Sequence, residues 1–122
     1  MIGHDATAAT VVNVLPAVSA ANTAAATSGW IDVRAYKGSL MFIVNSGAIT
    51  GSYVGKLQGA DDSGGTNGAD ITGATLASVS TANQAGSIVI SATARPFIKF
   101  VGTVTTGPVV ISVVLAAHPG SV

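Results

Sequence analysis

The chain has 122 residues, with five acidic and five basic side chains, no net charge and no cysteine. Without cysteine there is no disulfide framework and no thiolate chemistry, and without a basic excess there is no electrostatic footprint for nucleic acid. Charged residues make up 8% of the chain, against about 25% in ordinary soluble domains. So sparse a charged surface favours a chain that hides much of its surface in an assembly.

The N-terminal part predicts an arm followed by weak strands. Residues 1–10 are small and polar and predict a flexible arm, ahead of a single β-sandwich domain over residues 11–122. Residues 11–18 have an extended character, but Pro16 cannot donate a ladder hydrogen bond, so we expect an edge strand there. Residues 19–28 are rich in alanine and threonine, and we expect a weak strand, with a helix as the alternative.

Alternation over residues 30–36 predicts a strand with two unlike faces. Ile31, Val33 and Ala35 fall on one face, which we expect to point into the core. The opposite face carries Trp30, Asp32, Arg34 and Tyr36.

That second face holds the candidate interface residues. Because tryptophan, tyrosine and arginine are enriched at binding hot spots, Trp30, Arg34 and Tyr36 form the candidate protein interface. The alternative is that Trp30 tucks under a loop while Asp32 and Arg34 make an ordinary surface pair.

Two extended runs, residues 39–46 and residues 53–60, form the expected centre of the fold. Both faces of the first run are apolar, which predicts a strand that is covered on both sides. Its faces carry Leu40, Phe42 and Val44 on one side, and Met41 and Ile43 on the other. In the second run Gly55 lies inside a strand, which predicts a bulge or a close approach of another part of the chain.

An Asp-Asp-Ser-Gly-Gly sequence at residues 61–65 predicts a turn. Adjacent carboxylates such as Asp61 and Asp62 usually cap the backbone of a turn or face solvent. Calcium binding is the alternative, because Asn67 and Asp70 would add oxygen ligands, although the spacing of an EF-hand is absent.

The rest of the chain supplies four further short strands and no convincing helix. They are expected at residues 71–79, 87–92, 97–104 and 109–117. The residues expected to face inward in the last two are Ile98, Phe100, Val104, Ile111, Val113 and Leu115. Together, the expected strands predict an all-β fold, an antiparallel β-sandwich or jelly roll with an extended N-terminal arm. No stretch is long and apolar enough to predict a membrane span.

Residues suited to catalysis are scarce. A nucleophile needs a neighbouring base, and the two histidines, His4 and His118, lie near opposite ends of the chain. No serine stands in a G-x-S-x-G sequence, and two histidines without further ligands do not make a zinc site. We therefore expect a non-enzymatic protein without catalytic residues, cofactor or metal.

The order of features between residues 38 and 114 resembles that of small virion proteins of tailed phages. The segments that carry the resemblance are Asn45-Ser46-Gly47-Ala48, Val54-Gly55-Lys56-Leu57-Gln58, Asp61-Asp62, the sequence from Ala69 to Ala74, Arg95-Pro96-Phe97-Ile98-Lys99, and residues 103–107. They look like those of the capsid decoration or cement proteins of such phages, and the likeness covers about two thirds of the chain.

This resemblance implies a structural role on the capsid exterior of a virion. It implies a β-sandwich or jelly roll that ties subunits of the major capsid protein together as a homo-oligomer, a dimer or a trimer. The alternative is a tail- or fibre-associated binding module, which would grip host glycans or act as an adaptor between virion proteins. A glycan site would need an exposed aromatic platform, for which the candidates are Trp30, Tyr36 and Tyr53.

Overall fold

A computed structural model describes residues 10–20 and 25–119 of the chain, and this part is built of β-strands. The strands are β1 (Thr10–Ala20), β2 (Ala25–Thr27), β3 (Ile31–Asp32), β4 (Tyr36–Ile49), β5 (Ser52–Ala60), β6 (Ala69–Val79), β7 (Ala85–Ser91), β8 (Phe97–Thr106) and β9 (Val109–Pro119). The described residues contain no helix, so the prediction of an all-β chain is confirmed. No helix capable of crossing a membrane is found among them either.

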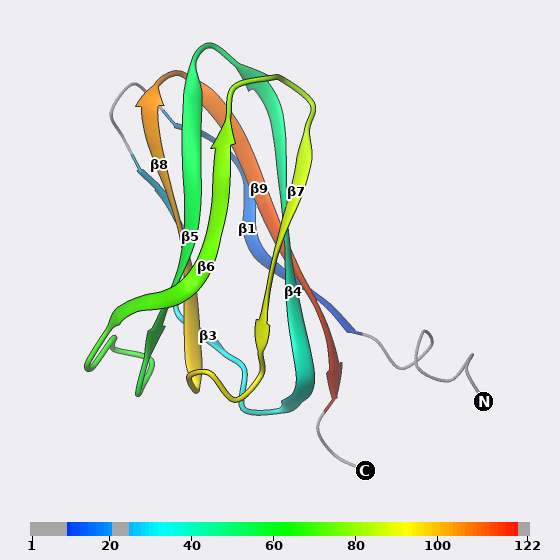
Figure 1. Ribbon diagram of the computed structural model, residues 1–122, viewed down its shortest axis with the longest axis vertical. Helices are drawn as coiled ribbons and strands as arrows, with labels where there is room; N and C mark the ends of the chain where they lie inside the picture. Colours follow the sequence, from blue (N-terminus) through cyan, green and yellow to red (C-terminus); the bar gives the residue numbers. More distant parts are fainter. Residues whose placement is uncertain (1–9, 21–24, 120–122) are drawn as a thin grey trace, which may run out of the picture.

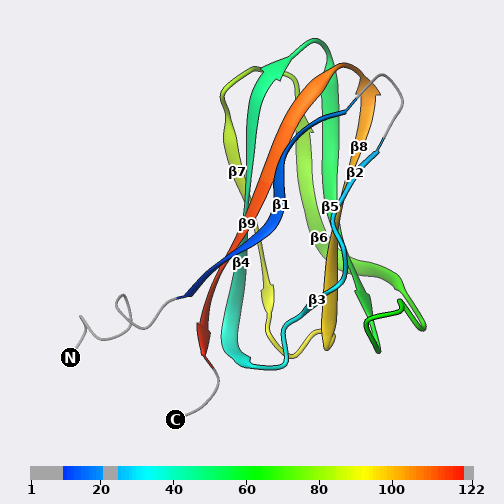
Figure 2. The ribbon, with the colours of Figure 1, turned by 180° about the vertical axis from the view of Figure 1, so that it is seen from behind.

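The strands form two antiparallel sheets that pack face to face as a sandwich (Figure 1). Sheet A has the order β1-β9-β4-β7, and sheet B has the order β2-β8-β5-β6, with β3 also paired to β8. Figure 2 shows the same two layers from behind. The chain crosses from one sheet to the other at each connection except β2–β3 and the β5–β6 hairpin. This is the strand order of a jelly roll in which β2 and β3 share one position.

The core lies between the two sheets. Leu40, Phe42 and Val44 of β4 are fully buried against sheet B. The six inward residues expected on β8 and β9 are buried as well. Period-2 alternation was therefore sufficient to place the core residues of β8 and β9, whereas for residues 39–46 it predicted cover on both faces and did not say which face points inward.

The edge strand predicted at residues 11–18 is confirmed, because β1 lies at the edge of sheet A. β1 pairs only with β9, and its register shifts twice around Pro16. These shifts turn both Val14 and Leu15 inward, although neighbours in a regular strand point to opposite faces. The predicted arm, apart from Thr10, lies outside the described residues, and so does the centre of the segment at 19–28, whose ends belong to β1 and β2.

Two predictions about strand faces are wrong. Residues 30–36 do not form one strand, because β3 ends at Asp32 and a turn at Arg34 and Ala35 leads into β4. Val33 is buried as expected, but Ala35 is exposed. No other described strand covers the outer face of residues 39–46, and Met41 on that face is 41% exposed.

Gly55 confirms the predicted close approach inside β5. A Cβ atom at this position would lie 2.8 Å from Cε1 of the buried Phe100 ring. Gly55 pairs with Gly102 on β8, where a Cβ atom would lie 3.0 Å from the other edge of the same ring. The Phe100 ring therefore covers a pair of glycines that have no side chains of their own.

Candidate functional site

The three predicted interface residues belong to different local elements, since Trp30 precedes β3, Arg34 lies in a turn and Tyr36 begins β4. Trp30 precedes β3 and lies against the β5–β6 loop, so closely that a Cβ on Gly65 would come 2.8 Å from its Nε1. The Lys99 ammonium lies 4.7 Å from the centre of the Trp30 ring. Tyr36 begins β4 and is half-buried. Trp30, Arg34 and Tyr36 do not share a strand face, and their assignment to a protein interface stays a prediction.

Asp32 and Arg34 form the surface pair of the alternative interpretation. The guanidinium donates to both carboxylate oxygens, with Nη2 2.8 Å from Oδ2 and Nε 3.0 Å from Oδ1. The Arg34 backbone amide donates to Asp32 as well, and the guanidinium lies 5.0 Å from the centre of the Phe97 ring. These bonds hold the turn that interrupts the predicted strand, while both side chains remain largely exposed.

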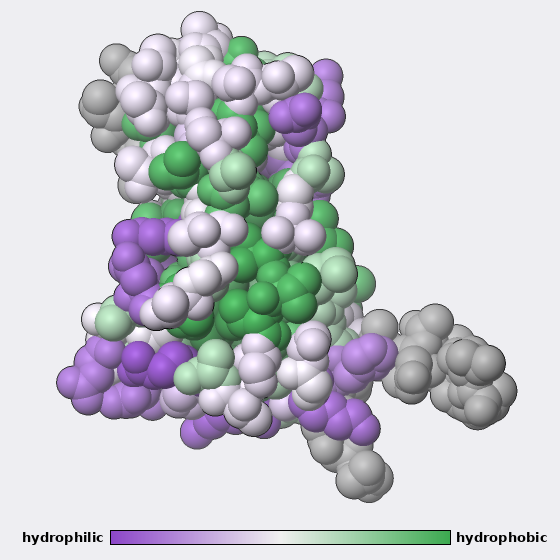
Figure 3. Space-filling view, viewed as in Figure 1, coloured by the Kyte–Doolittle hydropathy of each residue, from purple (hydrophilic) through white to green (hydrophobic). Residues whose placement is uncertain are grey.

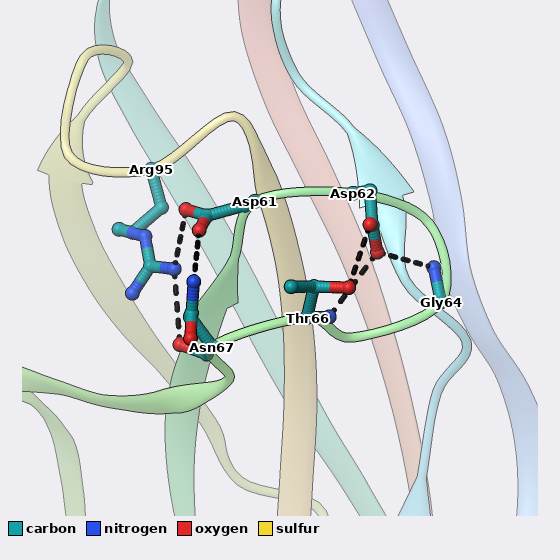
Figure 4. Close-up of polar contacts among 6 residues, drawn as sticks. All are labelled: Asp61, Asp62, Gly64, Thr66, Asn67 and Arg95. Atoms are coloured by element: carbon teal, nitrogen blue, oxygen red, sulfur yellow. Dashed lines mark hydrogen bonds and ion pairs between the residues drawn. The ribbon is translucent and has the colours of Figure 1, made fainter.

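The β5–β6 loop, residues 61–68, is held by its own two carboxylates (Figure 4). Asp62 accepts hydrogen bonds from the backbone amides of Gly64 and Thr66 and from the Thr66 hydroxyl. Asp61 accepts from the Asn67 side-chain amide and from Arg95, 34 residues further along the chain. The predicted structural turn is confirmed, with the carboxylates acting as caps.

The residues proposed as calcium ligands do not form one set. Asp70 accepts hydrogen bonds from Lys56 and Gln58 on the neighbouring strand, whereas Asp61 and Asp62 are bonded to donors of the loop and to Arg95. Nowhere in residues 10–20 and 25–119 do three histidine, cysteine or acidic side chains gather as metal ligands would. His118 pairs with Lys37 at the end of sheet A, and His4 lies outside the described residues.

These hydrogen bonds lower the pKa values of the carboxyl groups. The Arg34 side chain and amide lower the pKa of Asp32 from 3.8 to about 2. Bonds from Asn67 and Arg95 lower the pKa of Asp61, those from Thr66 lower that of Asp62, and those from Gln58 and Lys56 lower that of Asp70. A lowered pKa in the folded state means that the ionised carboxylate stabilises the fold above its unfolded pKa and that this stabilisation is lost as the pH falls.

We therefore expect the melting temperature to be flat between about pH 5 and pH 9 and to fall between about pH 4 and pH 2. Thermal unfolding followed by circular dichroism at constant ionic strength measures this profile. The matched variant carries Asp32→Asn, Asp61→Asn, Asp62→Asn and Asp70→Asn, and its profile should be flatter over the same range. A wild-type melting temperature that does not change down to pH 2 would contradict this assignment.

Charged residues are concentrated at one end of the sandwich, around the loops at 33–35, 61–68 and 92–96 (Figure 3, lower part), while Lys56 and Lys99 lie within strands of sheet B. We call this region the charged end. At the opposite end the connections at 50–51, 80–84 and 107–108 carry no charged residue. All four described aspartates accept hydrogen bonds from neighbouring residues, so their carboxylates already have partners within the chain.

The outer face of sheet A carries an exposed apolar row. Its members lie side by side across all four strands, since Met41 pairs with Val89 of β7 and Ala116 of β9, and Ala116 pairs with Val11 of β1. Val11 is 70% exposed, Val89 53% and Met41 41%. A hollow of ≈ 410 Å³ next to Met41 is also lined by Ser39, Val89, Ala117 and His118.

The outer face of sheet B is different in character. Its central strands place Lys56 and Lys99 on the surface, next to the exposed Val54. On sheet A the apolar row and the next row, Ile43 and Val114, contain no charge. The both-sided apolar pattern of residues 39–46 is the sequence signal for this face, although it does not show that the second side lies open. We take the apolar row, Val11, Met41, Val89 and Ala116, as the candidate functional site.

The fold defines a small antiparallel β-sandwich with a jelly-roll strand order and one apolar outer face. It is similar to SPBc2 prophage-derived protein YomS, whose crystal structure matches with a TM-score of 0.55 and 17% sequence identity over 88% of this chain and 92% of that chain. At this identity the likeness is one of fold, and the fold is that of a prophage-derived protein. No protein-family model and no curated protein matches the sequence.

Proposed function

We propose that the chain is a structural virion protein that binds the outside of a phage head and cements subunits of the major capsid protein. The observation that carries the proposal is the apolar row on sheet A, in which Met41 and Val89 stay exposed in the single chain. Exposed apolar surface of this kind is typical of a contact between proteins. The prophage origin of a protein with the same fold supports the setting.

The cementing role needs binding and no chemistry. A protein that binds the assembled shell better than free subunits stabilises the shell by mass action. The described residues suit this role, because their polar groups are used for loop structure and their apolar groups remain available on one sheet face. The partner is then the major capsid protein and the location is the capsid exterior.

The glycan-binding alternative is supported less well by the aromatic side chains. Tyr53 is buried in the core. The Trp30 ring lies against glycines of the β5–β6 loop and against the Lys99 ammonium, so it is not an open platform. Tyr36 is half-buried. Sugar-binding platforms need an open aromatic face, so we place the tail- or fibre-associated module second.

Quantitative mass spectrometry of purified virions tests the proposal. We expect this chain at a ratio of one, or a simple fraction of one, to the major capsid protein, because a cement protein occupies repeated positions on the shell. The tail protein of the same particles, which is present in few copies, provides the internal control. A trace ratio near that of the tail protein would overturn the proposal and favour the tail-associated module.

A further inference from the structure

The four outer edges of the two sheets differ in how they are protected. β1 contains Pro16 and two register shifts, and β2 has only three residues. β6 carries Asp70, a glycine with positive φ at Gly73, and register shifts in its pairing with β5. These are the devices by which natural sheets prevent further strand pairing. β7 has none of them, since it contains no charge and no proline and pairs with β4 in unbroken register.

The pairing with β4 fixes which backbone groups of β7 are free. The Ser46 amide donates to the Gln84 carbonyl, and the Ala92 amide donates to the Gly38 carbonyl, each at 2.8 Å. In an antiparallel ladder every second residue of a strand bonds to the same neighbour, so the even-numbered residues of β7 bond to β4. Ser87 and Val89 therefore point their amide and carbonyl groups away from β4, and no other described strand pairs with this edge.

The sequence of β7 is palindromic about Val89. It reads Ser-Ile-Val-Ile-Ser over residues 87–91. When two copies of a strand pair antiparallel about a two-fold axis, the residue n places before the axis meets the residue n places after it. With the axis at Val89, serine meets serine and valine meets valine on the outer face, while Ile88 meets Ile90 on the inner face.

The surroundings of β7 have the apolar surface that such a pairing would bury. Val89 ends the apolar row on sheet A and is 53% exposed. On the inner side, Ile90 of β7 and Ile71 and Leu76 of β6 are only partly buried. Figure 3 shows hydrophobic residues gathered on this side of the sandwich, between the strands labelled β6 and β7 in Figure 1.

We propose that two copies of this chain pair β7 to β7 about a two-fold axis at Val89. The two four-stranded A sheets then become one continuous sheet, and the apolar rows of both copies join into a single belt. A second copy is the partner that fits, because the palindrome places serine opposite serine and apolar residues opposite apolar residues in a self-pair, and because a strand without charge has no like charges to oppose in its own copy. The pairing does not depend on the role at the phage head.

Cysteine substitutions test the pairing and its register, because the native chain contains no cysteine. Val89→Cys should give a disulfide-linked dimer under mild oxidation, since opposed residues in an antiparallel pair have Cα atoms about 5.5 Å apart, within disulfide range. Ser87→Cys and Ser91→Cys should each stay unlinked alone and should link when mixed. Linkage of either serine variant with itself, or no linkage in any sample, would overturn the proposed register.

Sedimentation velocity over a concentration series tests the dimer itself. The unmodified chain should form a dimer, and Val89→Lys should raise its dissociation constant about 30-fold or more, because two lysines would face each other at the axis. Val54→Lys, on the outer face of sheet B, is the matched control and should leave the dimer unchanged. Circular dichroism checks that each variant is folded.

A second variant tests the pairing through a backbone hydrogen bond instead of through a side chain. Ser87→Pro removes an amide that points away from β4, so the ladder within the chain keeps its bonds while the pairing between copies loses two, one from each copy. Folded Ser87→Pro should also dissociate. A monomeric wild-type chain at every concentration, or a dimer that survives both Val89→Lys and Ser87→Pro, would overturn the proposal.

Discussion

Replacing Phe100 by alanine should lower the free energy of unfolding by about 3–5 kcal/mol. The side chain is fully buried at the centre of sheet B, and its ring fills the space above Gly55 and Gly102. Neither glycine has a side chain that could move into the cavity, so little of the loss can be recovered by repacking. Since small domains are stable by about 5–15 kcal/mol in total, we expect a marginal or unfolded protein.

Urea denaturation followed by tryptophan fluorescence measures this change. Val54→Ala is the matched control, because Val54 lies on the outer face of the same sheet and is 42% exposed. Its substitution should cost no more than about 0.5–1 kcal/mol. A loss of less than about 1 kcal/mol for Phe100→Ala would mean that the ring does not carry the packing of this layer.

A second substitution distinguishes packing from a general loss of structure. Gly55→Ala alone should destabilise the fold by about 1–3 kcal/mol, because its new Cβ meets the ring at 2.8 Å. In the Phe100→Ala background that clash is absent, so the same change should cost clearly less. Additive losses would show that the two sites are independent.

The alternation of apolar residues was enough to find the layer that contains Phe100. In β9 the residues expected to face inward are buried as well, but β4 is apolar on both faces, so its pattern did not distinguish the inner face from the outer one. The same rule failed at residues 30–36. There the alternation continues through a turn, and the bonds from Arg34 to Asp32 that stabilise the turn leave no mark on the apolar pattern.

Contacts between distant segments limited the prediction of the site. Asp61 and Arg95 lie 34 residues apart and meet only because β5 and β8 are neighbours. The sequence pattern of residues 39–46 indicated two apolar faces, and only the strand order shows that none of the described strands lies over the outer side of β4. The palindrome of β7 likewise gains meaning only once β7 is known to form an open edge.

Met41→Lys should reduce binding to phage heads by about 30-fold or more, as the loss of a hot-spot side chain does. Met41 stands in the middle of the apolar row, between Val89 and Ala116. Its side chain points to solvent, so the fold should tolerate lysine. A capsid contact on this face, in contrast, would have to bury an ammonium group that has no partner. Co-sedimentation of the purified variant with heads assembled without this chain measures the binding.

Val54→Lys is the matched control for this experiment as well, because Val54 is 42% exposed on sheet B and Met41 is 41% exposed on sheet A. Both variants gain the same charge at the same degree of exposure, and they differ only in the sheet face that is altered. Normal binding by Val54→Lys together with weak binding by Met41→Lys would place the capsid contact on sheet A. The reverse result would move the contact to sheet B, and saturation of heads by both variants would exclude both sheet faces and direct attention to the charged end.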